Sequence, residues 1–223
     1  MKYPVNFEIE LKRNNYPGKF IVFEGIDASG KTTHAKDLVE KLKARGVKAI
    51  YTKEPTDGEV GQMIRKVLGY KTKVPPVSLQ YLFCADRGVH QEEIISWLKK
   101  GYVIVSDRYF WSAVAYGISD LSGVVDYYLT VYSVLSFYNQ FIAPDFNFFL
   151  DVEVDEAVAR IKKSGKHKEI YDNRGKIVKI KDSYEKLIAK FQDEFTIIDA
   201  NRPIEKVSEE ILNTVYSILN TKK

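Results

Sequence analysis

The stretch Gly25-Ile26-Asp27-Ala28-Ser29-Gly30-Lys31-Thr32 decides the fold of this chain, because it matches the pattern G-x-x-x-x-G-K-[ST] at every fixed position. An apolar run at residues 20–24 precedes it, and a helical pattern at residues 31–45 follows it. In such a strand–turn–helix unit, glycines let successive backbone N–H groups face phosphate oxygens, and the helix N-terminus adds a favourable dipole. We expect the loop to hold the phosphates of a nucleoside triphosphate, with Lys31 at the β- and γ-phosphates and Thr32 as a ligand of Mg²⁺.

Short apolar runs alternate with helical patterns along the rest of the chain. The expected strands are residues 20–24, 47–52, 102–106, 146–150 and 196–198, and the expected helices are residues 31–45, 60–68, 78–100, 124–141, 155–163, 180–194 and 205–219. The alternation predicts an α/β fold of the P-loop NTPase type, a doubly wound five-stranded parallel sheet with helices on both faces and a short lid. One domain is expected to cover residues 19–223, with the lid at about 164–179. Residues 1–18 are expected to be an N-terminal extension, with a candidate edge strand at 5–11.

The charge and hydropathy of the chain favour a small anionic partner. The net charge of the 223 residues is +4, and the densest basic run, residues 162–181, contains a single aromatic residue, Tyr171. A nucleic-acid groove needs aromatics interleaved with such a run, so we expect nucleotides as partners and no nucleic acid. No apolar run approaches the ~18 residues of a membrane span, and residues 1–11 lack a sustained apolar core. We therefore expect no membrane partner, no secretory signal and a cytoplasmic location.

Cysteine and histidine chemistry is not expected. The chain has one cysteine, Cys84, which excludes an intrachain disulfide and a cysteine-based metal cluster. The histidines, His34, His90 and His167, have no metal-ligand spacing, and we interpret them as surface or edge residues.

A second candidate phosphate site, Ser106-Asp107-Arg108-Tyr109, follows the third expected strand. Ligands of open α/β sheets bind beyond the carboxyl ends of the strands, so Asp107 and Arg108 should reach the same crevice as the phosphate loop. A carboxylate there can hold Mg²⁺ directly or through water, and an arginine can bridge donor and acceptor phosphates.

Five segments, in this order along the chain, resemble the thymidylate kinase family. They are FEGIDASGKTT (residues 23–33), KEPTDGEVGQMIR (53–65), LFCADR (82–87), SDRYFWSAVAY (106–116) and PDFNFFLD (144–151). The resemblance extends from residue 20 to the C-terminus. It implies transfer of the γ-phosphoryl group of ATP to dTMP, giving dTDP and ADP, with Mg²⁺ as the metal. It also implies a homodimer, for which the apolar pattern at 124–141 is a candidate face.

The resemblance implies the residues that bind the sugar and phosphate of the acceptor. Asp27 looks like the carboxylate that meets the 3′-hydroxyl of the sugar, a charge-assisted hydrogen bond. Arg65, which follows Glu54 and Pro55 in the second segment, is similar to the arginine that grips the acceptor phosphate. Glu54 is placed with these substrate-binding residues.

The acceptor base is expected on another helix. Phe83 and Arg87 are four residues apart, so both lie on one helix face, where a ring and a guanidinium suit stacking on a planar base and hydrogen bonding to its carbonyl oxygen. In the family these residues contact thymine. Ser112 and Tyr116 look like the residues that close the pocket around base and sugar. Family members often carry glutamine after that tyrosine, whereas Gly117 stands here.

The resemblance also implies the ATP side of the site. The loop set ends with Thr33, and Asn201 and Arg202, after the last expected strand, are placed against adenine. Some relatives carry a catalytic arginine in the phosphate loop, where this chain has Ala28 and Ser29, so we expect that arginine in the lid. We favour Arg174, then Arg160, over the other lid candidates, Lys163, Lys166 and Lys168. Catalysis is then positioning and charge neutralisation by Lys31, Arg108, Mg²⁺ and the lid arginine.

Two other classes of function stay open on the sequence alone. One is a P-loop kinase of another nucleoside monophosphate or of a deoxynucleoside; the latter needs a base for a neutral hydroxyl, and Glu54 is the candidate. The other is a nucleotide-binding protein without this transfer, either a regulatory or nucleic-acid-associated ATPase or a catalytically silent nucleotide-binding module. No asparagine is followed by lysine, so the base-recognition element of a guanine-specific switch is absent from the sequence.

Overall fold

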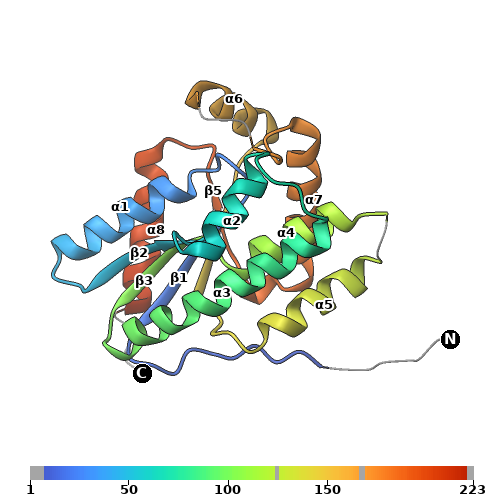
Figure 1. The fold of residues 1–223 in the computed structure, drawn as a ribbon. Coiled ribbons are helices and arrows are strands. Elements are labelled where there is room, and N and C mark those ends of the chain that lie inside the picture. The colour runs from blue at the N-terminus through green and yellow to red at the C-terminus, as the bar shows by residue number, and fades with distance from the viewer. Residues whose placement is uncertain (1–7, 124–125, 166–168, 220–223) are drawn as a thin grey trace.

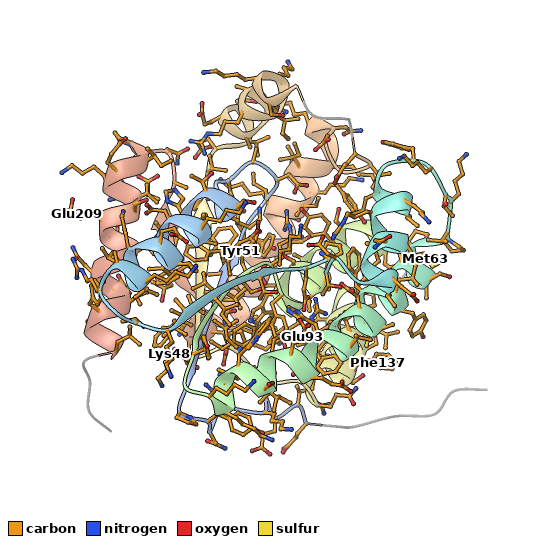
Figure 2. All side chains as sticks on the ribbon, turned by 60° about the vertical axis from the view of Figure 1, so that its left-hand side comes forward. Lys48, Tyr51, Met63, Glu93, Phe137 and Glu209 are labelled. Carbon is orange, nitrogen blue, oxygen red and sulfur yellow. The ribbon has the colours of Figure 1, made fainter. Side chains whose placement is uncertain are left out.

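The computed structural model describes residues 8–123, 126–165 and 169–219. Within them, five parallel strands form one sheet in the order β2-β3-β1-β4-β5. The strands are β1 (Lys19–Glu24), β2 (Ala49–Lys53), β3 (Val103–Asp107), β4 (Phe146–Asp151) and β5 (Thr196–Asp199). The predicted fold class is confirmed. β2 is an edge strand and crosses the front of Figure 2, where Lys48 and Tyr51 are labelled.

Helices cover both faces of the sheet (Figure 1). One face carries α1 (Lys31–Ala44) and α8 (Ile204–Leu219), and the other carries α3 (Pro76–Lys99), α4 (Phe110–Leu121) and α7 (Arg174–Lys190). The remaining helices are α2 (Glu59–Leu68), α5 (Tyr127–Tyr138), which packs on α4, α6 (Val154–Ser164) and the 3₁₀ helix η1 (Gln192–Glu194). Because both faces are covered, β1 and β3 are buried along almost their whole length. None of the helices in the described part of the chain is long and apolar enough to cross a membrane.

The register of the central strands assembles the site. Phe23, near the end of β1, pairs with Asp107 of β3 on one side and with Phe148 of β4 on the other. The segments that follow β1 and β3 therefore leave the sheet side by side at its carboxyl edge, where open α/β sheets bind their ligands. The amide of Arg108 donates to Phe23 O (2.9 Å), which extends this pairing one residue beyond β3.

Helix α4 is absent from the sequence-based expectation. Its first nine residues, 110–118, are all buried, so the helix presents no continuous polar face to solvent along these turns. Its N-cap residue, Tyr109, makes no side-chain capping bond, so the usual start signal is missing too.

The lid is shorter than predicted. Helix α7 begins at Arg174, where the sequence predicted a loop to residue 179 and a helix from 180. The Asn173 side chain caps the helix by accepting from the amide of Lys176 (3.0 Å), so the helix starts one residue after a strong N-cap. Helix α6 ends at Ser164 and α7 begins at Arg174; residues 166–168 between them, with the candidates Lys166 and Lys168, lie outside the described residues.

The N-terminal extension forms no strand between residues 8 and 11, so that part of the edge-strand prediction is wrong, and residues 5–7 lie outside the described residues. The chain instead makes one isolated parallel bridge, between Lys12 and Ile142. The predicted helix at 124–141 is the shorter α5, and residues 124–125 are also outside the described part.

Candidate active site

The phosphate-binding loop turns sharply between β1 and α1. Gly25 has φ +142°, and a Cβ built on it would lie 2.9 Å from the carbonyl oxygen of Leu150, so this position requires glycine. Gly30, with φ +103°, is the N-cap residue of α1. Ile26 and Ser29 are buried on the inner side of the turn, which leaves the outer side of the loop to face a ligand.

Lys31 is a buried cation at the start of α1. Its ammonium donates to the carbonyl oxygens of Ile26 (2.7 Å) and Gly25 (3.1 Å). Burial, reinforced by the charge of Arg108, lowers the pKa of Lys31 from its ordinary value of 10.5 to about 8, although Asp107 and Asp27 act in the opposite direction. A bound phosphate would supply the counter-charge that this buried lysine needs.

A cavity of about 580 Å³ opens over the loop and the N-terminus of α1. Its floor is the loop, the start of α1 and the end of β3. Its walls come from α6, the described residues after α6, the segment after β5 and the start of α8. Most of the predicted ATP-binding residues are among its lining residues, which are Asp27, Ala28, Gly30, Lys31, Thr32, Thr33, His34, Asp107, Arg108, Arg160, Ile161, Ser164, Glu169, Asp172, Ala200, Arg202 and Ile204.

Two oxygen donors that suit Mg²⁺ meet in this cavity. The hydroxyl of Thr32 donates to the carboxylate of Asp107, so both predicted metal ligands lie within reach of one ion. Within the described residues, no group of three or more His, Cys, Asp and Glu side chains forms a metal cage. A site with one carboxylate and one hydroxyl fits Mg²⁺, which keeps several waters and takes its other ligands from substrate phosphates.

A second cavity, of about 170 Å³, adjoins the first on the side of α2, α3 and α4. It brings together all eight residues that the sequence predicted for the acceptor. Its lining residues are Asp27, Glu54, Pro55, Arg65, Leu68, Phe83, Arg87, Arg108, Tyr109, Ser112, Ala113, Tyr116, Glu169 and Tyr171.

Arg108 lies where the two cavities meet, and it lines both of them with Asp27 and Glu169. Its backbone has φ +73°, a left-handed conformation that is uncommon outside glycine. Its guanidinium donates to the Asp27 carboxylate, to Tyr116 Oη (3.0 Å) and to Ser112 Oγ (3.0 Å). Burial alone would raise the pKa of Asp27, but the charges of Arg108 and Lys31 lower it below its usual value.

The far end of the smaller cavity is a buried polar cluster. Arg87 donates to Glu54 Oε2 (2.5 Å), and His90 Nδ1 lies 3.0 Å from Glu54 Oε1. Burial alone would lower the pKa of Arg87, but the neighbouring Glu54 carboxylate raises it well above its ordinary value. The prediction that His34 and His90 lie at the surface is wrong, since they are 5% and 2% exposed; His167 is outside the described residues.

Sequence reasoning missed Glu24 and Tyr171. Glu24 is fully buried at the end of β1 and accepts from the amides of Tyr109 (3.1 Å) and Ser112 (3.2 Å). Glu24, at the end of β1, therefore caps the N-terminus of α4. It also accepts from the hydroxyls of Ser112 and Tyr184. The sequence could have indicated this role, because Glu24 directly follows an apolar run and a buried carboxylate needs hydrogen-bond donors. Tyr171 packs edge-on against Tyr116, with ring centroids 4.6 Å apart, and no sequence pattern marked it.

The two predicted lid arginines differ in position. Arg160 lines the larger cavity and donates to the carbonyl oxygens of Ala200 (3.0 Å) and Ala28 (3.4 Å). Arg174, which the sequence favoured, lines neither cavity and pairs with exposed Asp155 (2.8 Å). Of the two candidates, only Arg160 therefore lines a cavity in this structure.

The two residues predicted to contact adenine, Asn201 and Arg202, also differ in position. Arg202 lines the larger cavity, whereas the Asn201 side chain accepts from the amide of Glu153 (2.9 Å) and donates to Asp199 (2.9 Å), and it is not among the lining residues. His34 lines the same cavity, 3.0 Å from Ser208 Oγ.

Comparisons with known proteins agree on one family. The family model described as thymidylate kinase matches residues 23–211. A probable thymidylate kinase of Methanococcus maripaludis is 40% identical and covers 88% of this chain and 94% of its own length; one of Pyrococcus horikoshii is 37% identical, with 89% and 96% covered. The fold matches the solved structure of thymidylate kinase from Candida albicans with a TM-score of 0.79 at 24% identity, over 92% of this chain and 94% of that one.

Proposed function

The chain belongs to the thymidylate kinase family and therefore transfers the γ-phosphoryl group of ATP to dTMP, giving dTDP and ADP, and we propose that the transfer takes place where its two cavities meet. ATP occupies the larger cavity in this proposal, and dTMP occupies the smaller one. The observation that carries the proposal is that Asp27 and Arg108 line both cavities, so that two ligands placed there approach each other end to end.

The chemistry that this arrangement supports is positioning with charge neutralisation. The attacking group is a phosphate oxygen of dTMP, which is already anionic at neutral pH because the second pKa of a phosphate monoester is about 6. No general base is needed, so Glu54 is free for a structural role. Lys31 faces the donor phosphates, and Arg108 faces the phosphates of both nucleotides, where developing charge is stabilised most effectively.

We place Mg²⁺ at Thr32 and Asp107. When bound there, the ion neutralises charge on the β- and γ-phosphates of ATP. The hydrogen bond from Thr32 to the buried Asp107 carboxylate supports this placement, because it brings the two candidate ligands together.

Arg160 is the best-placed arginine for the transferring group. It already lies in the larger cavity, where its two terminal nitrogens donate to backbone carbonyls that a phosphate can replace as acceptors, while its Nε pairs with Glu156 of the same helix (2.8 Å). Arg174 would have to leave its ion pair with Asp155 and enter the cavity.

The smaller cavity offers a suitable side chain for each part of the acceptor nucleotide. We assign the sugar 3′-hydroxyl to Asp27, the phosphate to Arg65 and the base to Phe83 and Arg87, with Ser112 and Tyr116 closing the pocket. Arg65 is pre-positioned by bonds to the carbonyl oxygens of Pro55 (2.7 Å) and Thr56 (2.5 Å), which fix its guanidinium at the cavity wall.

A homodimer is part of the proposal, with small nucleotides as the other partners, without nucleic acid or membrane, in the cytoplasm. Apolar side chains of α3 and α5 are exposed on one side of the molecule: Val77 (46%), Tyr81 (57%), Leu129 (60%) and Phe137 (44%). Figure 2 labels Phe137 at the outer surface of this side. Tyr81 and Phe137 already pack edge-on, with centroids 5.8 Å apart, as the centre of a face that a second copy would cover.

Turnover of dTMP tests the function. ADP release should be measured with dTMP, dUMP, AMP, CMP and thymidine as acceptors, for the wild-type chain and for Lys31→Ala. We expect the highest kcat/KM with dTMP and its loss in Lys31→Ala. Faster turnover of another acceptor would contradict the acceptor assignment, and ATP hydrolysis stimulated by DNA without any acceptor would favour the ATPase alternative.

A further inference from the structure

The guanidinium of Arg87 keeps two hydrogen-bond donors without a protein partner. Arg87 is 2% exposed, and only its Nη2 meets an acceptor, Glu54 Oε2. Within the described residues, Nε and Nη1 are buried and make no hydrogen bond. The rings of Tyr109 and Tyr138 hold the guanidinium at 5.0 and 4.5 Å from their centroids. Buried donors without acceptors are costly, so this side chain, which lines the smaller cavity, is arranged for an acceptor that the ligand brings.

His90 explains why Glu54 leaves those donors free. Arginine and carboxylate commonly pair through two parallel hydrogen bonds, which would use a second nitrogen of Arg87. Here the second carboxylate oxygen, Oε1, lies 3.0 Å from His90 Nδ1. Since a carboxylate only accepts, Nδ1 carries the hydrogen, and in the neutral ring Nε2 is left to accept from Thr52 Oγ1 at 2.8 Å.

His90 supports the cluster from behind the cavity wall. His90 and Arg87 lie three residues apart on α3, and Asp86 of the same helix accepts from the amide of Thr56 (2.8 Å), just after Glu54. The side chains of His90 and Glu54 are 1% and 4% exposed, so water does not compete for their hydrogen bond. His90 is in contact with Glu54 and does not line either cavity.

We propose that His90 is a positioning residue that sets base specificity: by occupying one oxygen of Glu54, it keeps two N–H donors of Arg87 available to a carbonyl oxygen of the acceptor base. The inference rests on the proposed binding of the acceptor base in the smaller cavity. The site then prefers a 4-oxo pyrimidine, whose carbonyl oxygen accepts from Arg87. In a 4-amino pyrimidine, the N–H groups of the amino substituent would face the N–H groups of Arg87. Removal of His90 lets Glu54 rotate and take a second nitrogen of Arg87, which weakens this preference.

The test compares dTMP with 5-methyl-dCMP, two acceptors that share sugar, phosphate and methyl group and differ by the 4-oxo and 4-amino groups. His90→Leu removes the donor to Glu54, and His90→Asn keeps an amide N–H near the position of Nδ1. We expect the ratio of kcat/KM values, dTMP over 5-methyl-dCMP, to fall about tenfold or more in His90→Leu and to stay within about threefold in His90→Asn, the size expected for one hydrogen bond to a charged group. The loss should appear in the KM for dTMP, with the KM for ATP unchanged.

A structural role alone would give another result. Ile94→Ala truncates a fully buried side chain further along α3 that lines neither cavity, so it should lower stability and keep the ratio. A wild-type ratio in folded His90→Leu overturns the proposal. If His90→Leu does not fold, Thr52→Val removes instead the hydroxyl that donates to Nε2 of the ring: a ratio reduced about threefold supports the proposal, and an unchanged ratio overturns it. Failure of the wild-type chain to phosphorylate dTMP overturns the proposed function together with this inference, whereas normal wild-type turnover with an unchanged ratio in the variants overturns the inference alone.

Discussion

Binding of ATP to this protein should take up a proton above pH 7, because Lys31 is buried without a full counter-charge. Burial and Arg108 lower its pKa to about 8 in the ligand-free chain, from an ordinary 10.5. The phosphates of ATP bring negative charge to the ammonium and should return its pKa towards the ordinary value. If that return is complete, binding takes up about 0.1 proton at pH 7, about 0.5 at pH 8 and about 0.9 at pH 9.

The sign of the effect follows from proton linkage. Between pH 8 and 10.5 the unfolded chain holds more protons at Lys31 than the ligand-free folded chain, so this residue's contribution to the free energy of unfolding rises with pH across that window. Binding of ATP needs the protonated lysine, so the affinity should fall as pH rises through the same window, by up to about tenfold per pH unit. At pH 8 and above the terminal phosphate itself, with a pKa of about 6, takes up no proton.

Isothermal titration calorimetry in buffers of different ionisation enthalpy measures this uptake directly. At one pH, the slope of the binding enthalpy against the buffer enthalpy gives the number of protons exchanged. Lys36→Met, which removes an exposed lysine of the same helix, should keep the wild-type slope, and Lys31→Met should lose it. A wild-type slope near zero at pH 8, or the same slope in Lys31→Met, would refute the reasoning.

Three further predictions concern catalysis, folding and assembly. Arg160→Ala should lower kcat by about 10³-fold or more, the usual effect of losing an arginine on the transferring group, while Arg174→Ala stays within about twofold in the same ADP-release assay; a larger loss in Arg174→Ala would reverse the assignment. Glu24→Gln should lower the free energy of unfolding in urea by about 1–3 kcal/mol, because its amide N–H₂ meets donors, and Tyr184→Phe, which removes only one donor, should cost less; equal stability of Glu24→Gln and wild type would contradict the capping role. Tyr81→Glu should convert a dimer to a monomer in light scattering, and an unchanged mass would place the interface elsewhere.

The sheet could be predicted from the sequence because its signals are local. Buried parallel strands are short apolar runs, and the loop at residues 25–32 fixes which edge of the sheet carries the site. Phe83 and Arg87 could be placed on one face because they have helical spacing, whereas Ser112 and Tyr116 were placed by the family resemblance, since α4 itself was not expected.

What the sequence could not give were the contacts between distant segments. Glu24 and Tyr184 are 160 residues apart, and only the packed structure brings the hydroxyl within 2.9 Å of the carboxylate. His90 was misplaced for the same reason: its partners Glu54 and Thr52 lie 36 and 38 residues away, on another element. The position of Arg174 could not be predicted either, because the cap at Asn173 starts α7 at Arg174, which pairs with Asp155 and lines neither cavity.

Two arginines of the site, Arg108 and Arg87, are already paired with carboxylates of the protein, and this sets how they should respond to nucleotides. Asp27 holds Arg108 and accepts from Tyr116 (3.0 Å), Glu54 holds Arg87, and Asp107 accepts from Thr32. Binding two anionic nucleotides therefore exchanges acceptors at fixed cations, which costs less than bringing unpaired cations together for the reaction. If the acceptor's 3′-hydroxyl takes Asp27, the carboxylate loosens its hold on Arg108, and that guanidinium becomes available to phosphate oxygens in both cavities. In this way the sugar of the acceptor and the charge at the transferring group are coupled through one ion pair.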